Sequence, residues 1–240
     1  MAIEQRLPPV RRIRWQHAHR IIPSRFPPID LFERVAPAKD WEALIALESL
    51  TNSRLRDAVG EIHLVAPEDR ISGPGASYVM ASFTHLNPKG SRFSDGRFGV
   101  YYAGKTFRTA LYETIHHMSE FYADTQLGPH TEDMRVLVGE IDASLHDIRR
   151  SRQWAPCLDR GDYRQSRSLA LRLRSLGSNG IVYPSVRDQA GECVAVFRPR
   201  CVSPPIQANH ISYHWDGNAV SRYFDYGRSE WVDLPNYTRK

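Results

Sequence analysis

The chain has 240 residues, of which 41% are hydrophobic and 10% aromatic, a composition that supports a sizeable core and excludes a disordered protein. It contains no apolar run of about 18 residues and no apolar segment after its basic start, so we expect neither a membrane span nor a secretory signal. The net charge of +5 suits nucleic acid, a polyanionic small substrate or an acidic protein partner, and composition does not separate these.

The cysteines indicate the redox environment. Cys157, Cys193 and Cys201 fit neither a disulfide framework nor a CxxC metal spacing. None of the three has a recognisable catalytic context. We therefore expect reduced thiols and a cytoplasmic protein.

The first third of the chain begins with a proline-rich arm. Residues 1–40 should be extended or irregular, because proline removes backbone donors and fixes φ. Asp40 is a suitable N-cap for a helix that Gly60 can close. Residues 61–65 and 77–83 are interpreted as short strands, separated by a loop rich in glycine, serine and proline.

In the centre and the C-terminal part of the chain, segments with the hydrophobic period of a helix follow segments with that of a strand. Apolar residues at helical spacing predict helices, and β-branched or alternating runs predict strands. The predicted elements are a strand at 100–103, a helix from Thr106, a strand at 134–141, a helix at 164–176, and strands at 181–183 and 193–197.

The order of these elements is not a strict βαβ alternation, so the predicted fold class is α+β. We expect a single domain built on a mixed sheet with flanking helices and an N-terminal extension. Residues 1–65 would form an arm and a helix packed on the main domain, residues 66–203 the catalytic core, and residues 204–240 an aromatic-rich tail packed on the core.

One central stretch carries three residue types that a dinucleotide substrate would require. The planar guanidinium of Arg92 matches phosphate oxygens, and the ring of Tyr102 can stack on nicotinamide. The carboxylate of Glu113 can stabilise the positive charge that develops on ribose when a glycosidic bond breaks.

The same residues also have a purely structural interpretation. On a helical projection Glu113 falls with His116, His117 and Glu120, opposite the apolar stripe, and a charged helical face is usually solvated. This spacing could also support a metal site, but no HExxH or cysteine–histidine set completes it, so we expect no metal. By themselves, Arg92 and Tyr102 would be a surface arginine and a core strand residue.

The stretch resembles the signature of the RES domain family. That signature begins with Gly-Arg-Trp-Asn, continues to a strand ending in Tyr-Ala-Ser, and then enters a helix that reads Ala-Leu-x-Glu. The counterparts here are residues 91–94 (SRFS), residues 102–104 (YAG) and residues 110–113 (ALYE). Arg97, in a Gly-Arg-Phe, is a competing counterpart of the arginine, but it lies closer to Tyr102 than the family pattern allows.

A second motif lies near the C-terminal end. The family has a glycine, a short strand, Pro-Ser, a polar turn and Gly-x-Asn, and this chain has GIVYPSVR at 180–187 followed by GEC at 191–193. Ser185 matches the serine, whereas Cys193 stands where asparagine is common. Taken alone, Ser185 could simply cap a strand end. The N-terminal stretch around Arg20 and Arg25 is similar to the opening strand of longer RES proteins, although a surface arginine is an equally good interpretation.

The resemblance implies a single RES domain similar to the ADP-ribosyltransferase fold, and NAD+ as its substrate. It implies that Glu113 acts on the ribose hydroxyls and the developing cation, and that Tyr102 stacks on nicotinamide. Arg92 would bind phosphates or ribose, Ser185 would add hydrogen bonds, and Arg25 would be a further NAD+ contact.

The resemblance further implies the toxin of a type II toxin–antitoxin system, blocked at its active site by an Xre-like antitoxin. Such a toxin would transfer ADP-ribose to a protein, for example an enzyme of nucleotide synthesis, and would meet nucleic acid only through the antitoxin. The alternative is an NAD+ glycohydrolase or phosphorylase. A further alternative is a non-catalytic nucleic-acid-binding protein on a RES scaffold, suggested by the arginine belt between Arg149 and Arg174.

Overall fold

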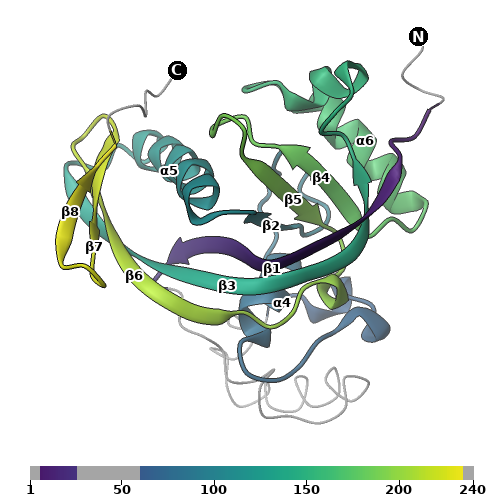
Figure 1. The fold of residues 1–240 in the computed structure, drawn as a ribbon, viewed down its shortest axis with the longest axis horizontal. Helices are drawn as coiled ribbons and strands as arrows, with labels where there is room; N and C mark the ends of the chain where they lie inside the picture. The colour runs from purple at the N-terminus through teal and green to yellow at the C-terminus, as the bar shows by residue number, and fades with distance from the viewer. Residues whose placement is uncertain (1–5, 26–59, 235–240) are drawn as a thin grey trace.

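The computed structural model describes residues 6–25 and 60–234. In it, two long antiparallel strands, β1 (Val10–Pro23) and β3 (His130–Asp147), pair to form the base of the fold (Figure 1). Because successive side chains of a strand point to opposite faces, Ile13 and Trp15 of β1 both lie in the core. A bulge after Trp15 shifts the register, so that Ala18 and Ile21 are the next buried positions.

Three shorter strands close the sheet over this base. They are β2 (Tyr101–Gly104), β5 (Glu192–Val196) and β4 (Gly180–Pro184), and they pair in that spatial order. β2 meets β1 at one residue pair, and β4 runs parallel to the last two residues of β3. Because β1 also pairs with β3, these five strands form a ring, with the β4–β5 loop at its rim.

The C-terminal residues extend the same sheet on the other side of β3. β6 (Ile206–Trp215) pairs antiparallel with the first half of β3, and β7 (Val220–Asp225) and β8 (Glu230–Asp233) follow as a meander (Figure 1). The buried Tyr213 and Trp215 anchor this extension in the core under α5. The sequence indicated a packed aromatic tail and did not indicate these strands.

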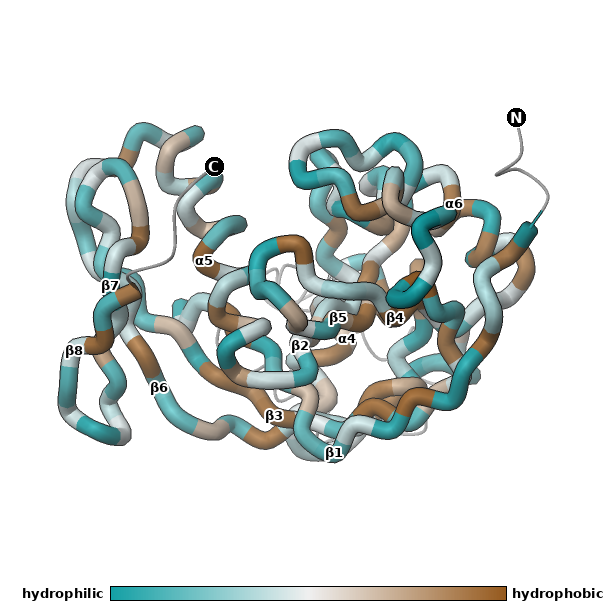
Figure 2. Tube along the Cα trace, turned by 45° about the horizontal axis from the view of Figure 1, so that its top comes forward, coloured by the Kyte–Doolittle hydropathy of each residue, from teal (hydrophilic) through white to brown (hydrophobic). Residues whose placement is uncertain are grey.

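Helices cover both faces of the sheet. α5 (Phe107–Asp124) lies on the concave side of β3 and β6, where Leu111, Ile115 and Tyr122 pack in the core, and its N-cap Thr106 accepts a hydrogen bond from the Thr109 amide (Figure 1). α6 (Arg164–Ser175) packs on β4, and α4 (Ala76–Thr84) lies on the opposite side of the β1–β3 pair from α5. In Figure 2 the hydrophobic segments lie mainly in the strands and the polar ones in the connections.

The prediction of an α+β fold with a mixed sheet is confirmed. The elements predicted from residue 100 to residue 197 are present at nearly the predicted positions. The structure extends the strand predicted at 134–141 to eighteen residues, and residues 10–23 of the proline-rich arm form a regular strand. The helix predicted from Asp40 lies outside the described residues.

Two predicted strands are wrong. Residues 61–65 contain a single 3-10 turn, Ile62–Leu64, and residues 77–83 belong to the helix α4. The buried residues of α4 recur at helical spacing, as Ala76, Val79, Met80 and Phe83, and they pack against the underside of the sheet. Tertiary packing therefore outweighs the local β propensity of this segment. Among the described residues, no helix has the length and apolar character needed to cross a bilayer.

Candidate active site

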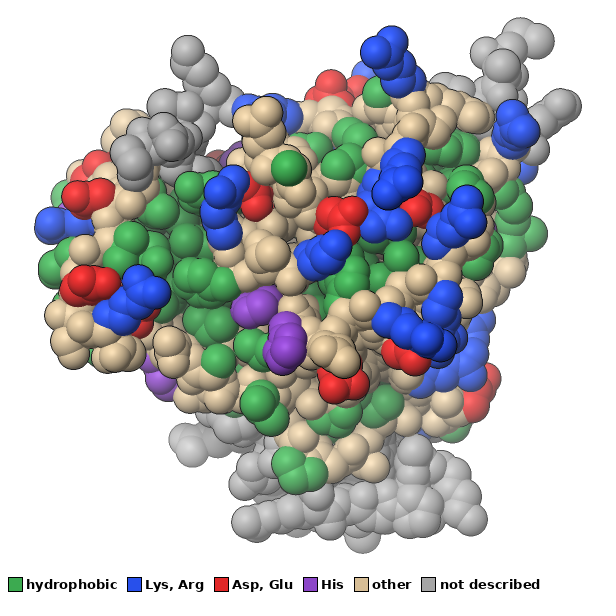
Figure 3. Space-filling view, in the orientation of Figure 1, with side chains coloured by type: hydrophobic (Ala, Val, Ile, Leu, Met, Phe, Trp, Pro, Cys, Tyr) green, Lys and Arg blue, Asp and Glu red, His purple; other side chains and the backbone are tan. Residues whose placement is uncertain are grey.

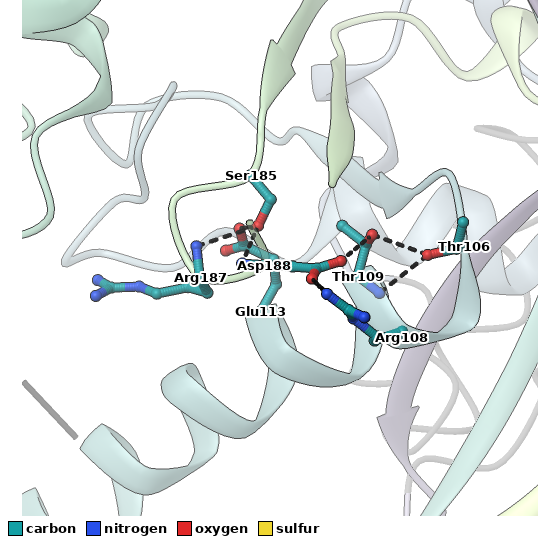
Figure 4. A network of polar contacts seen from close by, with 7 residues as sticks. All are labelled: Thr106, Arg108, Thr109, Glu113, Ser185, Arg187 and Asp188. Carbon is teal, nitrogen blue, oxygen red and sulfur yellow. Dashed lines mark hydrogen bonds and ion pairs between the residues drawn. The ribbon is translucent and has the colours of Figure 1, made fainter. Parts of the chain in front are cut away.

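Glu113 points towards the β4–β5 loop instead of into solvent (Figure 4). It lies in the second turn of α5 and is half-buried, and its Oε1 accepts a hydrogen bond of 2.6 Å from the Ser185 hydroxyl. The interpretation of this helical face as simply solvated therefore does not hold at Glu113. The two residues come from motifs that lie 72 positions apart in the sequence.

The direction of the Ser185 hydrogen bond is fixed by its surroundings. Its hydroxyl oxygen accepts hydrogen bonds from the backbone amides of Arg187 (3.1 Å) and Asp188 (2.9 Å), which occupy both lone pairs. The single hydroxyl proton must then be donated to Glu113. The Cys193 thiol, 3.8 Å away, donates to the same Oε1, and no described residue donates to Oε2. One carboxylate oxygen is thus held by the protein, and the other accepts no hydrogen bond from the described residues.

A second network fastens the β4–β5 loop to the start of α5 (Figure 4). The buried carboxylate of Asp188 accepts two hydrogen bonds from the Arg108 guanidinium, at 2.9 and 2.6 Å, and one of 2.7 Å from the Thr109 hydroxyl. Gly191 leaves the required space, because a Cβ there would lie 2.7 Å from the Asp188 carboxylate. We call Arg108, Thr109 and Asp188 the clamp, and it fixes the loop that carries Ser185.

Tyr102 and Arg92 form the opposite side of the site. The Tyr102 hydroxyl is 2.7 Å from that of Ser91 and accepts a hydrogen bond from the Phe93 amide, and burial raises its pKa to about 12. It therefore stays neutral and holds the turn that carries Arg92. The Arg92 guanidinium donates to the carbonyls of Cys157 and Asp159 and lies over an aromatic ring, that of Tyr163, at 4.6 Å.

Tyr183 on β4 is buried, and its ring packs edge-on against that of Phe93 with 4.9 Å between the ring centroids. Burial is the main reason why the pKa of its hydroxyl lies well above its usual value. The smaller electrostatic influences on this hydroxyl come from Cys193, Glu113, Tyr102 and Arg92. Residues of both sequence motifs therefore act on one buried side chain.

The remaining arginine candidates lie elsewhere or act differently. Arg25 pairs with Glu132 at 3.5 Å and lies over the Phe121 ring near the end of α5, so the structure does not bring it to Glu113. Arg20 is half-buried and donates to the Tyr102 carbonyl at 3.1 Å, which makes it a support of β2. Arg97 pairs with its neighbour Asp95 on the surface.

Sequence reasoning missed the role of His116. Its ring is buried, and its Nε2 accepts a hydrogen bond of 2.6 Å from Arg187, because arginine has only donors. Burial, followed by the charge of Arg187, lowers the pKa of His116 to about 3, so the ring is neutral at physiological pH. His117 and Glu120 complete a set of possible metal ligands with His116, but Arg187 already occupies the Nε2 atom. Sequence spacing showed this set and not the arginine that contacts it.

Two arginines of the belt, Arg149 and Arg164, are paired with carboxylates. On the face shown in Figure 3, Lys and Arg side chains are most numerous over the half that carries α6. Arg149 pairs with Asp147 and Glu192, and Arg164 pairs with Asp162. These ion pairs reduce the free positive charge that the sequence suggested for this surface.

Comparison with known proteins identifies one family. The profile of the RES domain matches residues 67–216. The uncharacterized protein y4oC of Sinorhizobium fredii (strain NBRC 101917 / NGR234) is 30% identical over 203 residues, which cover 85% of this chain and 84% of that protein. A chain in the crystal structure of the M. tuberculosis MbcT–MbcA toxin–antitoxin complex is similar over 90% of both chains, with a TM-score of 0.44 and 10% identity.

The clamp predicts a measurable contribution to stability. Asp188→Asn removes the charge that Arg108 binds and replaces one acceptor by a donor facing Thr109. The free energy of unfolding in urea should fall by about 1–3 kcal/mol, the usual range for hydrogen bonds to charged groups. The control is Asp124→Asn, whose ion pair with Lys89 is exposed on both sides and should contribute at most about 1 kcal/mol. Equal losses in the two variants would contradict the clamp.

Proposed function

Because the chain belongs to the RES domain family, we propose that it binds NAD+ and cleaves the bond between nicotinamide and ribose. The supporting observation is the Glu113 carboxylate, whose Oε1 is held by Ser185 while its Oε2 has no donor among the described residues. A carboxylate fixed in this way can accept from the ribose hydroxyls and face the positive charge that develops at the anomeric carbon.

The chemistry requires electrostatic stabilisation more than a strong acid. As the glycosidic bond breaks, its electron pair goes to the nicotinamide nitrogen, which leaves as a neutral ring, and the ribose becomes oxocarbenium-like. The acceptor then adds to the anomeric carbon and loses a proton. In this scheme Glu113 stabilises the cation, the half-buried Tyr102 ring stacks on nicotinamide, and Arg92 contacts the phosphates or ribose.

Arg92 fits this role only with a rearrangement. It is 7% exposed, and its guanidinium donates to two backbone carbonyls of the segment that precedes α6. A phosphate would have to replace at least one of those carbonyls. We therefore expect this segment to move when substrate binds, and we keep Arg25 outside the proposed site because its partners are Glu132 and Phe121.

We further propose that the acceptor is a protein, and that the chain is the toxin of a toxin–antitoxin pair. An enzyme that drains NAD+ or modifies a central enzyme is harmful whenever it is free. An inhibitory partner at the pocket mouth would control it. The exposed part of the basic surface over α6 offers an acidic partner segment a place to bind (Figure 3). Degradation of NAD+ with water or phosphate as acceptor remains the alternative outcome.

Glu113→Gln is the direct test of the proposed cleavage. The amide keeps the size of the side chain but loses the negative charge, so nicotinamide release should fall by about 10²–10³-fold. The matched control is Glu140→Gln, an exposed carboxylate on β3, which should keep the wild-type rate. Thermal unfolding of both variants should stay near that of the wild type. Wild-type turnover by Glu113→Gln at saturating NAD+ would refute the assignment.

The acceptor is identified with NAD+ labelled on the adenylate. Purified protein is incubated with this NAD+ in the presence and absence of cell lysate, with Glu113→Gln as the inactive reference. We expect the label on a discrete protein band in the presence of lysate. If free ADP-ribose or its phosphate ester were the sole product, the enzyme would degrade NAD+ and transfer to a protein would be refuted.

The antitoxin proposal predicts competition at the pocket. Co-expression with the adjacent small gene should give a complex in which NAD+ binding is strongly weakened, because the partner occupies the mouth of the site. Association should slow as salt rises, since steering between opposite charges is screened. A complex that binds NAD+ as tightly as the free protein would contradict this mode of inhibition.

A further inference from the structure

Arg187 is a cation that no carboxylate of the described residues neutralises. Its Nη2 donates to His116 Nε2 at 2.6 Å and to the Arg160 carbonyl at 2.8 Å. Its Nε is buried without an acceptor, and no described carboxylate lies within 4.0 Å of its guanidinium. In Figure 4 its side chain extends away from the clamp and from Asp188.

Other arginines near this site have carboxylate partners. Arg108, in the clamp, is matched by Asp188, and Arg164 at the start of α6 is matched by Asp162. Arg187, Arg92 and Arg167 instead donate to carbonyls or to a histidine, with no carboxylate partner among the described residues. Holding buried or half-buried charges without a counter-charge is unfavourable, so this group of arginines is suited to an anion.

Both arginines reach the same short segment, because Arg92 donates to the Asp159 carbonyl at 2.6 Å and Arg187 donates to the adjacent Arg160 carbonyl at 2.8 Å. Arg187 and Arg92 are among the charges that lower the pKa of His116, after the larger effect of burial. The carboxylates that face this group of charges are Glu113 and Glu120, both on α5. Glu113 is held by Ser185 and Glu120 is exposed beside the histidines, so neither neutralises Arg187 directly.

We propose that Arg187, together with Arg92, forms an anion subsite that binds the diphosphate of the dinucleotide substrate. The inference rests on the proposed function and adds a residue to it. His116 and the Arg160 carbonyl hold the Arg187 guanidinium at one nitrogen, while Nη1 keeps its donors for phosphate oxygens. Arg187 follows Ser185 by two residues, so the loop that orients the catalytic carboxylate also carries the phosphate ligand.

Placing both functions on one loop has a consequence for substrate selection. A phosphate bound to Arg187 would fix the position of the loop that already donates to Glu113 through Ser185. A ligand without phosphates would not contact Arg187. Arg187 should therefore discriminate between ligands by their phosphates and leave the recognition of nicotinamide unaffected.

The test compares ligands with and without phosphates by titration calorimetry. Arg187→Gln should weaken the binding of ADP-ribose and of inorganic pyrophosphate by about 10- to 100-fold, the range for losing a charged hydrogen-bond donor. Nicotinamide riboside, which has no phosphate, should bind to the variant as it does to the wild type. Arg187→Lys keeps the positive charge but lacks the planar guanidinium. Its affinity for ADP-ribose should therefore lie between those of the wild type and Arg187→Gln.

Arg164→Gln is the matched control, because it removes one arginine from an exposed ion pair outside the pocket. The proposal is overturned if Arg187→Gln binds ADP-ribose as tightly as the wild type, or if nicotinamide riboside is weakened equally, as a purely structural role would require. It is also overturned if the wild type binds neither phosphate ligand. Nicotinamide release by the wild type is measured separately, so a failure of NAD+ cleavage is distinguished from a failure of the Arg187 assignment.

Discussion

The hydrogen bond from Ser185 to Glu113 is the contact on which the candidate site depends. It joins a helix and a loop that lie far apart in the sequence, and its direction follows from two backbone amides that occupy the lone pairs of the serine. The clamp holds the same loop from its other end through the buried carboxylate of Asp188. Because both anchors act on one short loop, the carboxylate is oriented before any substrate arrives, which is how electrostatic catalysis reduces reorganisation.

The fold supports this contact through the ring of five strands. β4 and β5 carry the loop, and β2 carries Tyr102, which orders the turn of Arg92 through its hydroxyl. α5 is held by its apolar stripe in the concavity of β3 and β6, which leaves its N-terminal turns facing the loop. Charge is distributed unevenly over this frame. Arg149 and Arg164 are paired with carboxylates, whereas Arg92 and Arg187 are held by carbonyls and a neutral histidine.

Much of the fold from residue 100 onwards could be predicted from sequence, because those segments have clear hydrophobic periods. The segment of α4 was misread, since its aromatic and β-branched residues favour strands locally while packing under the sheet selects a helix. The long β1–β3 pairing and the closure of the ring were not predictable from local patterns. Register and strand order depend on contacts between residues more than a hundred positions apart.

The sequence by itself determined the family resemblance and the chemical types present: a carboxylate, a tyrosine, an arginine and a serine in two motifs. Only the tertiary structure decided that Glu113 faces Ser185 instead of water, that Arg25 lies with Glu132, and that Arg187 contacts His116. The physical reason is that a motif specifies side chains and their local backbone. Which of them meet, and which charges stay without a partner, follows from how the strands and helices pack.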